Sequence, residues 1–135
     1  MKVLVLTAEA INADVLRDAL GDDAAQDAEV LVVSPALQDS GLRFWMSDAD
    51  KAIARAEEVQ VETVERLDEE GIDAAGDTGD ADPLLAVQDA LATFAAERIV
   101  IVSHPTGEKA MFEEGAVGQI KERFGVPVES YEVAR

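Results

Sequence analysis

The sequence contains no cysteine, so neither a disulfide framework nor a thiolate metal site is expected. Histidine occurs once, which excludes a His-rich metal centre, and we expect no bound metal. Basic residues are also scarce, because 11 lysines and arginines stand against 29 acidic residues and give a formal charge of -18. Nucleic acids and anionic membranes are recognised through clustered basic side chains, so we expect neither as a partner. The acidity is most simply a solubility feature.

Long apolar runs are missing as well. The apolar stretch at residues 3–6 is too short for the hydrophobic region of a signal peptide or for a membrane span. A chain of 135 residues has the length of a single domain and can bury about two thirds of its unfolded surface without cross-links. The sequence therefore predicts one cytoplasmic domain over residues 1–135.

What the chain does contain is a regular alternation of strand and helix patterns. Residues 2–7, 28–37 and 97–104 are runs rich in valine, isoleucine and leucine, typical of strands covered on both faces. Residues 72–79 form a weaker strand pattern, and residues 126–133 form the last one. The sequence therefore predicts five strands.

Apolar residues at helical spacing fill the intervals between these strands. The first helix begins near Ile11 and ends at Gly21, where a left-handed residue is favoured. The second begins at Ser47, which forms a capping-box-like start with Asp50, and ends at Gly71. Its expected apolar stripe, interrupted by the polar Gln60, consists of Ala49, Ile53, Ala56, Val64 and Leu67.

Two further helices follow. Asp82 caps the third, and Pro83 occupies its first helical position. The fourth ends at Gly125, with Lys121 and Arg123 near its negative end. Strands alternating with helices across short links predict an α/β fold, a three-layer α/β/α sandwich with an open five-stranded parallel sheet and helices on both faces. Its ligand crevice is expected at the carboxyl ends of the central strands, where strand order reverses.

Familiar phosphate-binding motifs are absent from the segments that reach this crevice. A dinucleotide fingerprint needs glycines after the first strand, but the chain reads TAEAINAD there. A Walker A loop needs glycine directly before lysine, whereas Glu108 separates Gly107 from Lys109. A receiver domain needs an acidic pair after the first strand, where the chain has only Glu9. These three classes are excluded.

The segments KVLVLTAEA, GDADPLLAV, ERIVIVSHP and EEGAVGQIKERFGVPVESYEV together resemble the universal stress protein (UspA-like) family in its single-domain form. The resemblance spans nearly the whole chain. It implies a Rossmann-like sheet and a stress-response function. It also implies that, in nucleotide-binding members, a G-x2-G-x9-G motif followed by serine or threonine holds the phosphates and ribose of ATP.

This chain departs from that motif at most positions. The matching residues are Val102, Pro105, Gly115 and Ala116, so only the third glycine is kept, and the aspartate that holds adenosine in binding members corresponds to Ala8. A branched side chain blocks close approach to the backbone, and proline removes a donor. Losing one or two charge-assisted hydrogen bonds, about 1.5 to 3 kcal/mol each, weakens binding by about ten- to ten-thousand-fold. We therefore expect no cofactor, with ATP and AMP disfavoured.

A different anion remains an open alternative. Hydroxyl, imidazole, ammonium and amide donors gather in the loop after the strand at 97–104, although each is also an ordinary loop residue. The loop GLRFWM adds large side chains that either reach a ligand or plug the core edge. The candidate crevice residues are Thr7, Arg43, Trp45, Ser103, His104, Thr106, Gly107, Lys109 and Gly115.

The last strand bears on partners. Val126 and Val128 share one parity and Tyr131 and Val133 the other, so the strand is either apolar on both faces or bulged at residues 129–130. An apolar edge strand invites pairing, and the resemblance implies a homodimer through this strand. No nucleophile–base pair converges in the crevice, so we expect no enzyme. The sequence favours a dimeric, non-enzymatic stress-response domain. It leaves as the alternative a domain that binds a nucleotide or another phosphorylated metabolite through the altered loop after residues 97–104.

Overall fold

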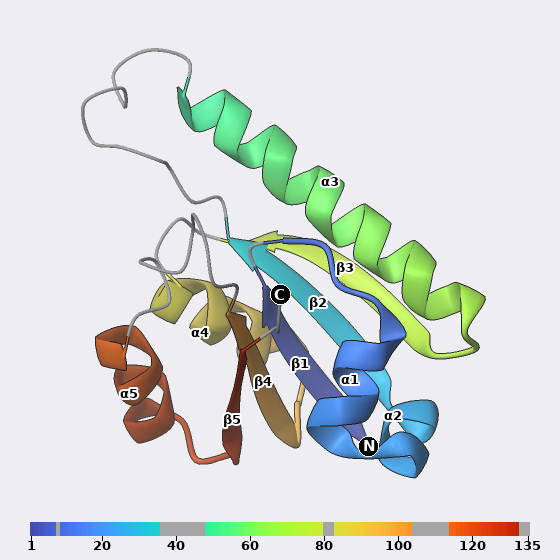
Figure 1. Cartoon of the computed structure of the whole chain (residues 1–135). Coiled ribbons are helices and arrows are strands. Elements are labelled where there is room, and N and C mark those ends of the chain that lie inside the picture. Colours follow the sequence, from blue (N-terminus) through green and yellow to red (C-terminus); the bar gives the residue numbers. More distant parts are fainter. Residues whose placement is uncertain (8, 36–47, 80–82, 104–113, 133–135) are drawn as a thin grey trace.

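The computed structural model describes residues 1–7, 9–35, 48–79, 83–103 and 114–132 (Figure 1). These residues form one sheet, whose order is β3-β2-β1-β4-β5 and whose ladders are all parallel. The expected open parallel sheet is therefore confirmed. The strands are β1 (Lys2–Thr7), β2 (Glu29–Pro35), β3 (Asp73–Gly79), β4 (Arg98–Ser103) and β5 (Val128–Glu132).

Helices cover both faces of this sheet. The layer formed by α1, α2 and α3 packs on one face, and α4 and α5 pack on the other (Figure 1). This division follows from right-handed crossovers, because the chain moves outward from β1 to β3 on one side and returns to β4 and β5 on the other. None of the described helices is long and apolar enough to cross a bilayer. The helices are α1 (Ala13–Leu20), α2 (Asp22–Asp27), α3 (Asp48–Glu69), α4 (Pro83–Thr93) and α5 (Glu114–Arg123).

Side chains of β1 fill the core on both faces of the sheet. Val3 and Val5 lie in the cluster under α1, α2 and α3, whereas Leu4 and Leu6 lie in the cluster under α4 and α5. All four are fully buried. The apolar run that opens the chain therefore encodes a central strand, as predicted.

The short helix α2 was not predicted. Gly21 ends α1 as expected, with φ 95°, and its N–H donates to the carbonyl of Arg17 at 2.8 Å. The Gly21 carbonyl then accepts from the N–H of Ala25 at 2.9 Å, which starts α2 at once. The sequence DDAAQD is short and polar, so only the burial of Ala25 distinguishes it from a loop.

The apolar stripe predicted for α3 is only partly correct. Ala56 and Leu67 are buried and Val64 packs against the core, but Ile53 is 45% exposed. Figure 1 shows the reason, because the first turns of α3 extend beyond the carboxyl ends of the strands. The side chain of Ala49 lies outside the described residues.

Strand β5 is continuous, so the predicted alternative of a bulge is wrong. Its pairing with β4 runs without interruption from Ile99↔Val128 to Ser103↔Glu132. Val128 packs in the core under α5, and Tyr131 packs on the opposite face. The strand is therefore apolar on both faces. Val133 lies outside the described residues.

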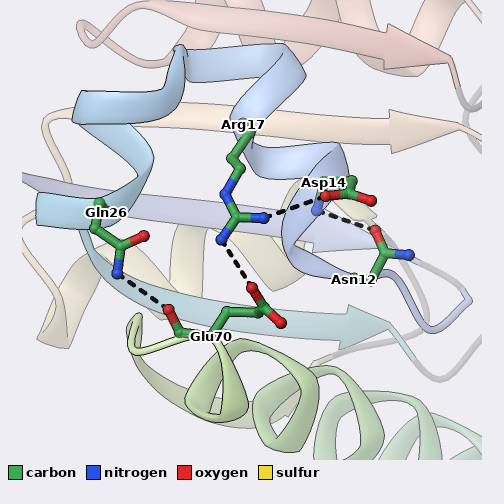
Figure 2. A network of polar contacts seen from close by, with 5 residues as sticks. All are labelled: Asn12, Asp14, Arg17, Gln26 and Glu70. Atoms are coloured by element: carbon green, nitrogen blue, oxygen red, sulfur yellow. Dashed lines mark hydrogen bonds and ion pairs between the residues drawn. The ribbon is translucent and has the colours of Figure 1, made fainter.

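A polar network ties the helices of the first layer together (Figure 2). Asn12 caps α1 by accepting from the N–H of Asp14 at 3.1 Å. Arg17 donates to Asp14 at 3.2 Å and to Glu70, just after α3, at 3.0 Å. Gln26 of α2 donates to the Glu70 carbonyl at 3.1 Å. The contacts with Glu70 raise the pKa of the Arg17 guanidinium, but solvent screens them, so the network orients helices more than it stabilises the fold.

Candidate functional site

The sheet order places the candidate site at the carboxyl ends of β1 and β4. Strand order reverses between these two neighbours, which is where ligands bind in open α/β sheets. Thr7 ends β1 and pairs with Val102 of β4. Both residues are fully buried, and Val102 belongs to the core cluster under α1. Side chains therefore fill the junction between the two strands on that face.

The hydroxyl of Thr7 is used by the turn that follows β1. It donates to the carbonyl of Glu9 at 2.6 Å and accepts from the N–H of the same residue at 3.3 Å. A little further on, the N–H of Ile11 donates to the hydroxyl of Thr63 in α3 at 3.2 Å. These contacts give Thr7 a structural role and fix the first loop against α3.

A row of hydroxyl groups crosses the sheet beneath α3. Leu6 pairs with Val33, so Thr7 and Ser34 follow at equivalent places on β1 and β2, and Ser34 pairs with Thr78 of β3. The hydroxyl of Thr78 accepts from the side-chain amide of Gln60 at 3.2 Å. We call this set the α3 polar cluster, and its members are Thr7, Ser34, Gln60, Thr63 and Thr78.

Ser34 stands out within the α3 polar cluster. Its side chain is buried, and its hydroxyl makes no hydrogen bond within the part of the chain that the structure describes. An unpaired buried hydroxyl is unfavourable, by about 1 to 3 kcal/mol. Among the described side chains of this cluster, Ser34 is therefore the one whose buried hydroxyl takes part in no hydrogen bond at all.

The side chain of Gln60 packs closely against β3 because the strand residue that faces it is Gly76. A Cβ atom added at Gly76 would lie 1.9 Å from the side-chain oxygen of Gln60 and 3.2 Å from its Cβ. Only glycine leaves room for this close approach. The glycine thus makes room for the Gln60 side chain of α3 to pack against β3.

Besides Thr7, two of the predicted crevice residues lie in described elements. Ser103 ends β4 beside Thr7 at the end of β1, and Gly115 is the second residue of α5. Outside the described residues lie Arg43, Trp45, His104, Thr106, Gly107 and Lys109, and so do the motif positions Ala8 and Pro105.

The sequence reasoning missed Ser34, Thr63 and Thr78. A simple signal existed for two of them, because Ser34 and Thr78, like Thr7, are hydroxyl residues near the end of a strand. Among the described residues no group of histidine, aspartate and glutamate could hold a metal ion.

No family model and no curated protein matches the sequence. The structure, however, is similar to solved ones. A universal stress protein from Archaeoglobus fulgidus superimposes with a TM-score of 0.65 at 21% identity, over 96% of this chain and 92% of that one. A universal stress protein from the same organism in complex with dAMP gives a TM-score of 0.65 at 20% identity, over 96% of each chain.

The chain has the universal stress protein fold. This confirms the architecture that the sequence resemblance implied, including the Rossmann-like sheet. The similarity covers nearly the whole of both chains, so it concerns the complete domain. At this level of identity it establishes the fold, and the bound dAMP is a property of the Archaeoglobus protein.

Proposed function

We propose that this chain is a cytoplasmic universal stress protein-like domain that acts as a dimeric interaction module, catalyses no reaction and does not bind ATP in the manner of the nucleotide-binding family members. The single observation that carries the proposal is the burial of Val102 in the core opposite Thr7. The universal stress protein fold supports the stress-response part.

The burial of Val102 argues against a nucleotide at the β1–β4 junction. A ligand approaching the Val102 main chain from the α1 side would have to displace a fully buried valine side chain. Exposing such a side chain costs about 1.5 to 3 kcal/mol. That cost lowers affinity by about ten- to a hundred-fold.

Calorimetry and thermal shift with ATP and AMP test this part of the proposal. We expect no saturable binding at millimolar nucleotide. A rise of several degrees in the melting temperature with ATP that disappears in Lys109→Ala would contradict it. A Lys121→Ala variant, which removes one positive charge from an exposed position of α5, is the matched control.

The dimer part of the proposal uses the outer edge of β5. The N–H of Ile99 donates to the carbonyl of Pro127 at 2.9 Å, so in a parallel ladder the backbone of Ser130 points away from β4. Two-fold antiparallel pairing centred on Ser130 would set Glu129 opposite Tyr131 of the partner and Val128 opposite Glu132. No two carboxylates would then be directly opposed.

Light scattering and sedimentation measure the mass of the chain in solution. We expect a dimer at micromolar concentration and a monomer for Ser130→Pro, which removes the outward N–H and leaves the bonds to β4 in place. Ser130→Thr keeps that donor and is the control. A monomeric mass for the unmodified chain would refute the dimer.

Ser34 favours a second candidate, a domain that binds a nucleotide or another phosphorylated metabolite. Its buried hydroxyl has no partner in the described structure and lies at the carboxyl end of β2. Thermal shift with a panel of phosphorylated metabolites tests this candidate. A metabolite that stabilises the chain but not Ser34→Ala supports it, whereas a Ser34→Ala variant that is simply more stable, with no metabolite effect on either chain, excludes it.

A further inference from the structure

β3 lies at the other edge of the sheet, and half of its backbone groups point outward. In the described structure it pairs only with β2. The N–H of Glu29 donates to the carbonyl of Met1 at 2.8 Å, so the backbone of Glu29 faces β1 and that of Val30 faces β3. Because Val30 pairs with Ala74, the backbone groups of Ala74 and of every second residue after it point away from the sheet.

The side of β3 turned toward the α4 layer carries exposed acidic side chains. Asp73, Ala75 and Asp77 share this side and are all exposed, whereas Ala74 and Thr78 face α3. The strand reads DAAGDTG, with no proline, lysine or large side chain to block pairing. The side chains of β3 itself therefore present no steric obstacle to the addition of another strand.

The aspartates oppose pairing of β3 with a second copy of itself. Two-fold antiparallel pairing preserves the faces of the sheet, so the Asp73 and Asp77 carboxylates of both copies would lie on one face. In the register centred on Ala75, Asp73 would stand directly opposite Asp77 of the partner. Like charges opposed in this way are destabilising. Pairing about Gly76 would avoid this direct opposition, but it would still give none of the four carboxylates a basic partner, whereas a cationic strand would give one to both Asp73 and Asp77.

We propose that β3 docks an extended cationic segment of a partner protein, which adds to the sheet as an antiparallel strand with basic side chains four residues apart. These side chains stand opposite Asp73 and Asp77. Both aspartates would occupy non-hydrogen-bonded positions of the new ladder, where opposing side chains are closest. The long aliphatic stems of lysine or arginine would lie over the exposed Ala75. The charge of -18 steers a cationic segment toward the chain.

The inference rests on the proposed interaction role and names the partner class for it. It uses a different edge from the β5 dimer. Light scattering reports the dimer and peptide binding reports the β3 edge, so failure of one is distinguishable from failure of the other.

The direct test uses the peptide TKVTVKT, which has the length of β3 and lysines four residues apart. Binding is followed by fluorescence anisotropy, and the site is located by NMR shifts of the β3 amides. In the proposed ladder the valine N–H groups face β3 and the lysine N–H groups face away. We expect N-methylation of both valines to weaken binding about ten-fold or more and N-methylation of both lysines to leave it unchanged.

Charge reversal tests the role of the aspartates. Asp73→Lys combined with Asp77→Lys should weaken binding of the peptide about ten-fold or more and should create binding of the acidic peptide TEVTVET. Glu58→Lys combined with Glu65→Lys changes the net charge equally on the outer surface of α3 and should have a much smaller effect.

Three results would each overturn the inference. Equal binding of the two N-methylated peptides would show attraction without a new strand. Equal losses in the two charge-reversed variants, or no binding of TKVTVKT at millimolar concentration, would also overturn it. The N-methylated peptides use the unmodified chain, so this test stands even if a charge-reversed variant fails to fold.

Discussion

Replacing Gly76 by alanine probes the contact between β3 and α3 most directly. The new methyl group would lie 1.9 Å from the side-chain oxygen of Gln60, 3.0 Å from its Cδ and 3.2 Å from its Cβ. Gln60 must therefore swing away and release its hydrogen bond to Thr78. The lost bond is worth about 0.5 to 1.5 kcal/mol, and an off-rotamer side chain costs a similar amount.

An opposing term acts on the unfolded chain. Alanine restricts the unfolded backbone more than glycine and stabilises by about 0.4 to 1 kcal/mol. The net expectation for Gly76→Ala is a loss of about 1 to 2 kcal/mol. In a Gln60→Ala background the contacts with the side-chain oxygen and Cδ are absent and only the 3.2 Å contact with the Cβ of residue 60 remains, so the same change should range from neutral to stabilising by about 1 kcal/mol.

Urea denaturation of the four chains of this double-mutant cycle measures the coupling directly. A difference of about 2 kcal/mol between the two backgrounds is expected, which corresponds to several degrees in melting temperature. Gly118→Ala in α5 is the control, because a Cβ there meets nothing within 4 Å and should stabilise the helix by up to about 1 kcal/mol. Equal effects of Gly76→Ala with and without Gln60 would refute the reasoning.

Three further predictions concern single contacts. Thr63→Val should lower the free energy of unfolding by about 1 to 3 kcal/mol, because it leaves the buried N–H of Ile11 without an acceptor. Thr63→Ser keeps the acceptor and should not lower it, and chemical denaturation compares the two variants. The hydrogen bond to Asp18 raises the pKa of Tyr131, so this contact stabilises the fold below the unfolded tyrosine pKa and is lost as pH rises through the folded value. Asp18→Asn should therefore lower the midpoint of tyrosinate absorbance, which reports Tyr131 alone because the chain has one tyrosine. Arg17→Gln should change the free energy of unfolding by less than about 1 kcal/mol, because its ion pairs with Asp14 and Glu70 lie at the surface. Salt screens such pairs, so a loss that is larger in high salt than in low salt would contradict this reasoning.

The sequence predicted the sheet well because burial on both faces leaves a strong signal. Val3 to Leu6 in β1 are fully buried, and an apolar run of this length without polar interruption is typical of a central parallel strand. Helix ends were also predictable where glycine adopts a left-handed conformation, as at Gly71, which has φ 81° and donates to the carbonyl of Asp68.

The errors have a different origin, because they depend on distances between elements. A helical pattern shows which side of α3 is apolar but not how far the sheet extends beneath it, so the exposure of Ile53 was missed. The α3 polar cluster needs β2 beside β3 and α3 above them, and Ser34 and Thr78 are far apart in the sequence. For the candidate site, the sequence located the strand ends and identified Thr7, whereas its contacts with Glu9 required the structure.

The place of β1 at the middle of the sheet affects how the chain emerges from the ribosome. One edge of β1 pairs with β2, which begins at Glu29 and is therefore synthesised shortly after β1. The other edge waits for β4, and the bond from the N–H of Glu97 to the carbonyl of Lys2 joins residues 95 positions apart. Translation at about 5 to 20 residues per second leaves that edge without its partner strand for about 5 to 20 seconds. During this interval a nascent chain has an unpaired valine- and leucine-rich strand edge, which is the kind of surface that promotes aggregation between nascent chains.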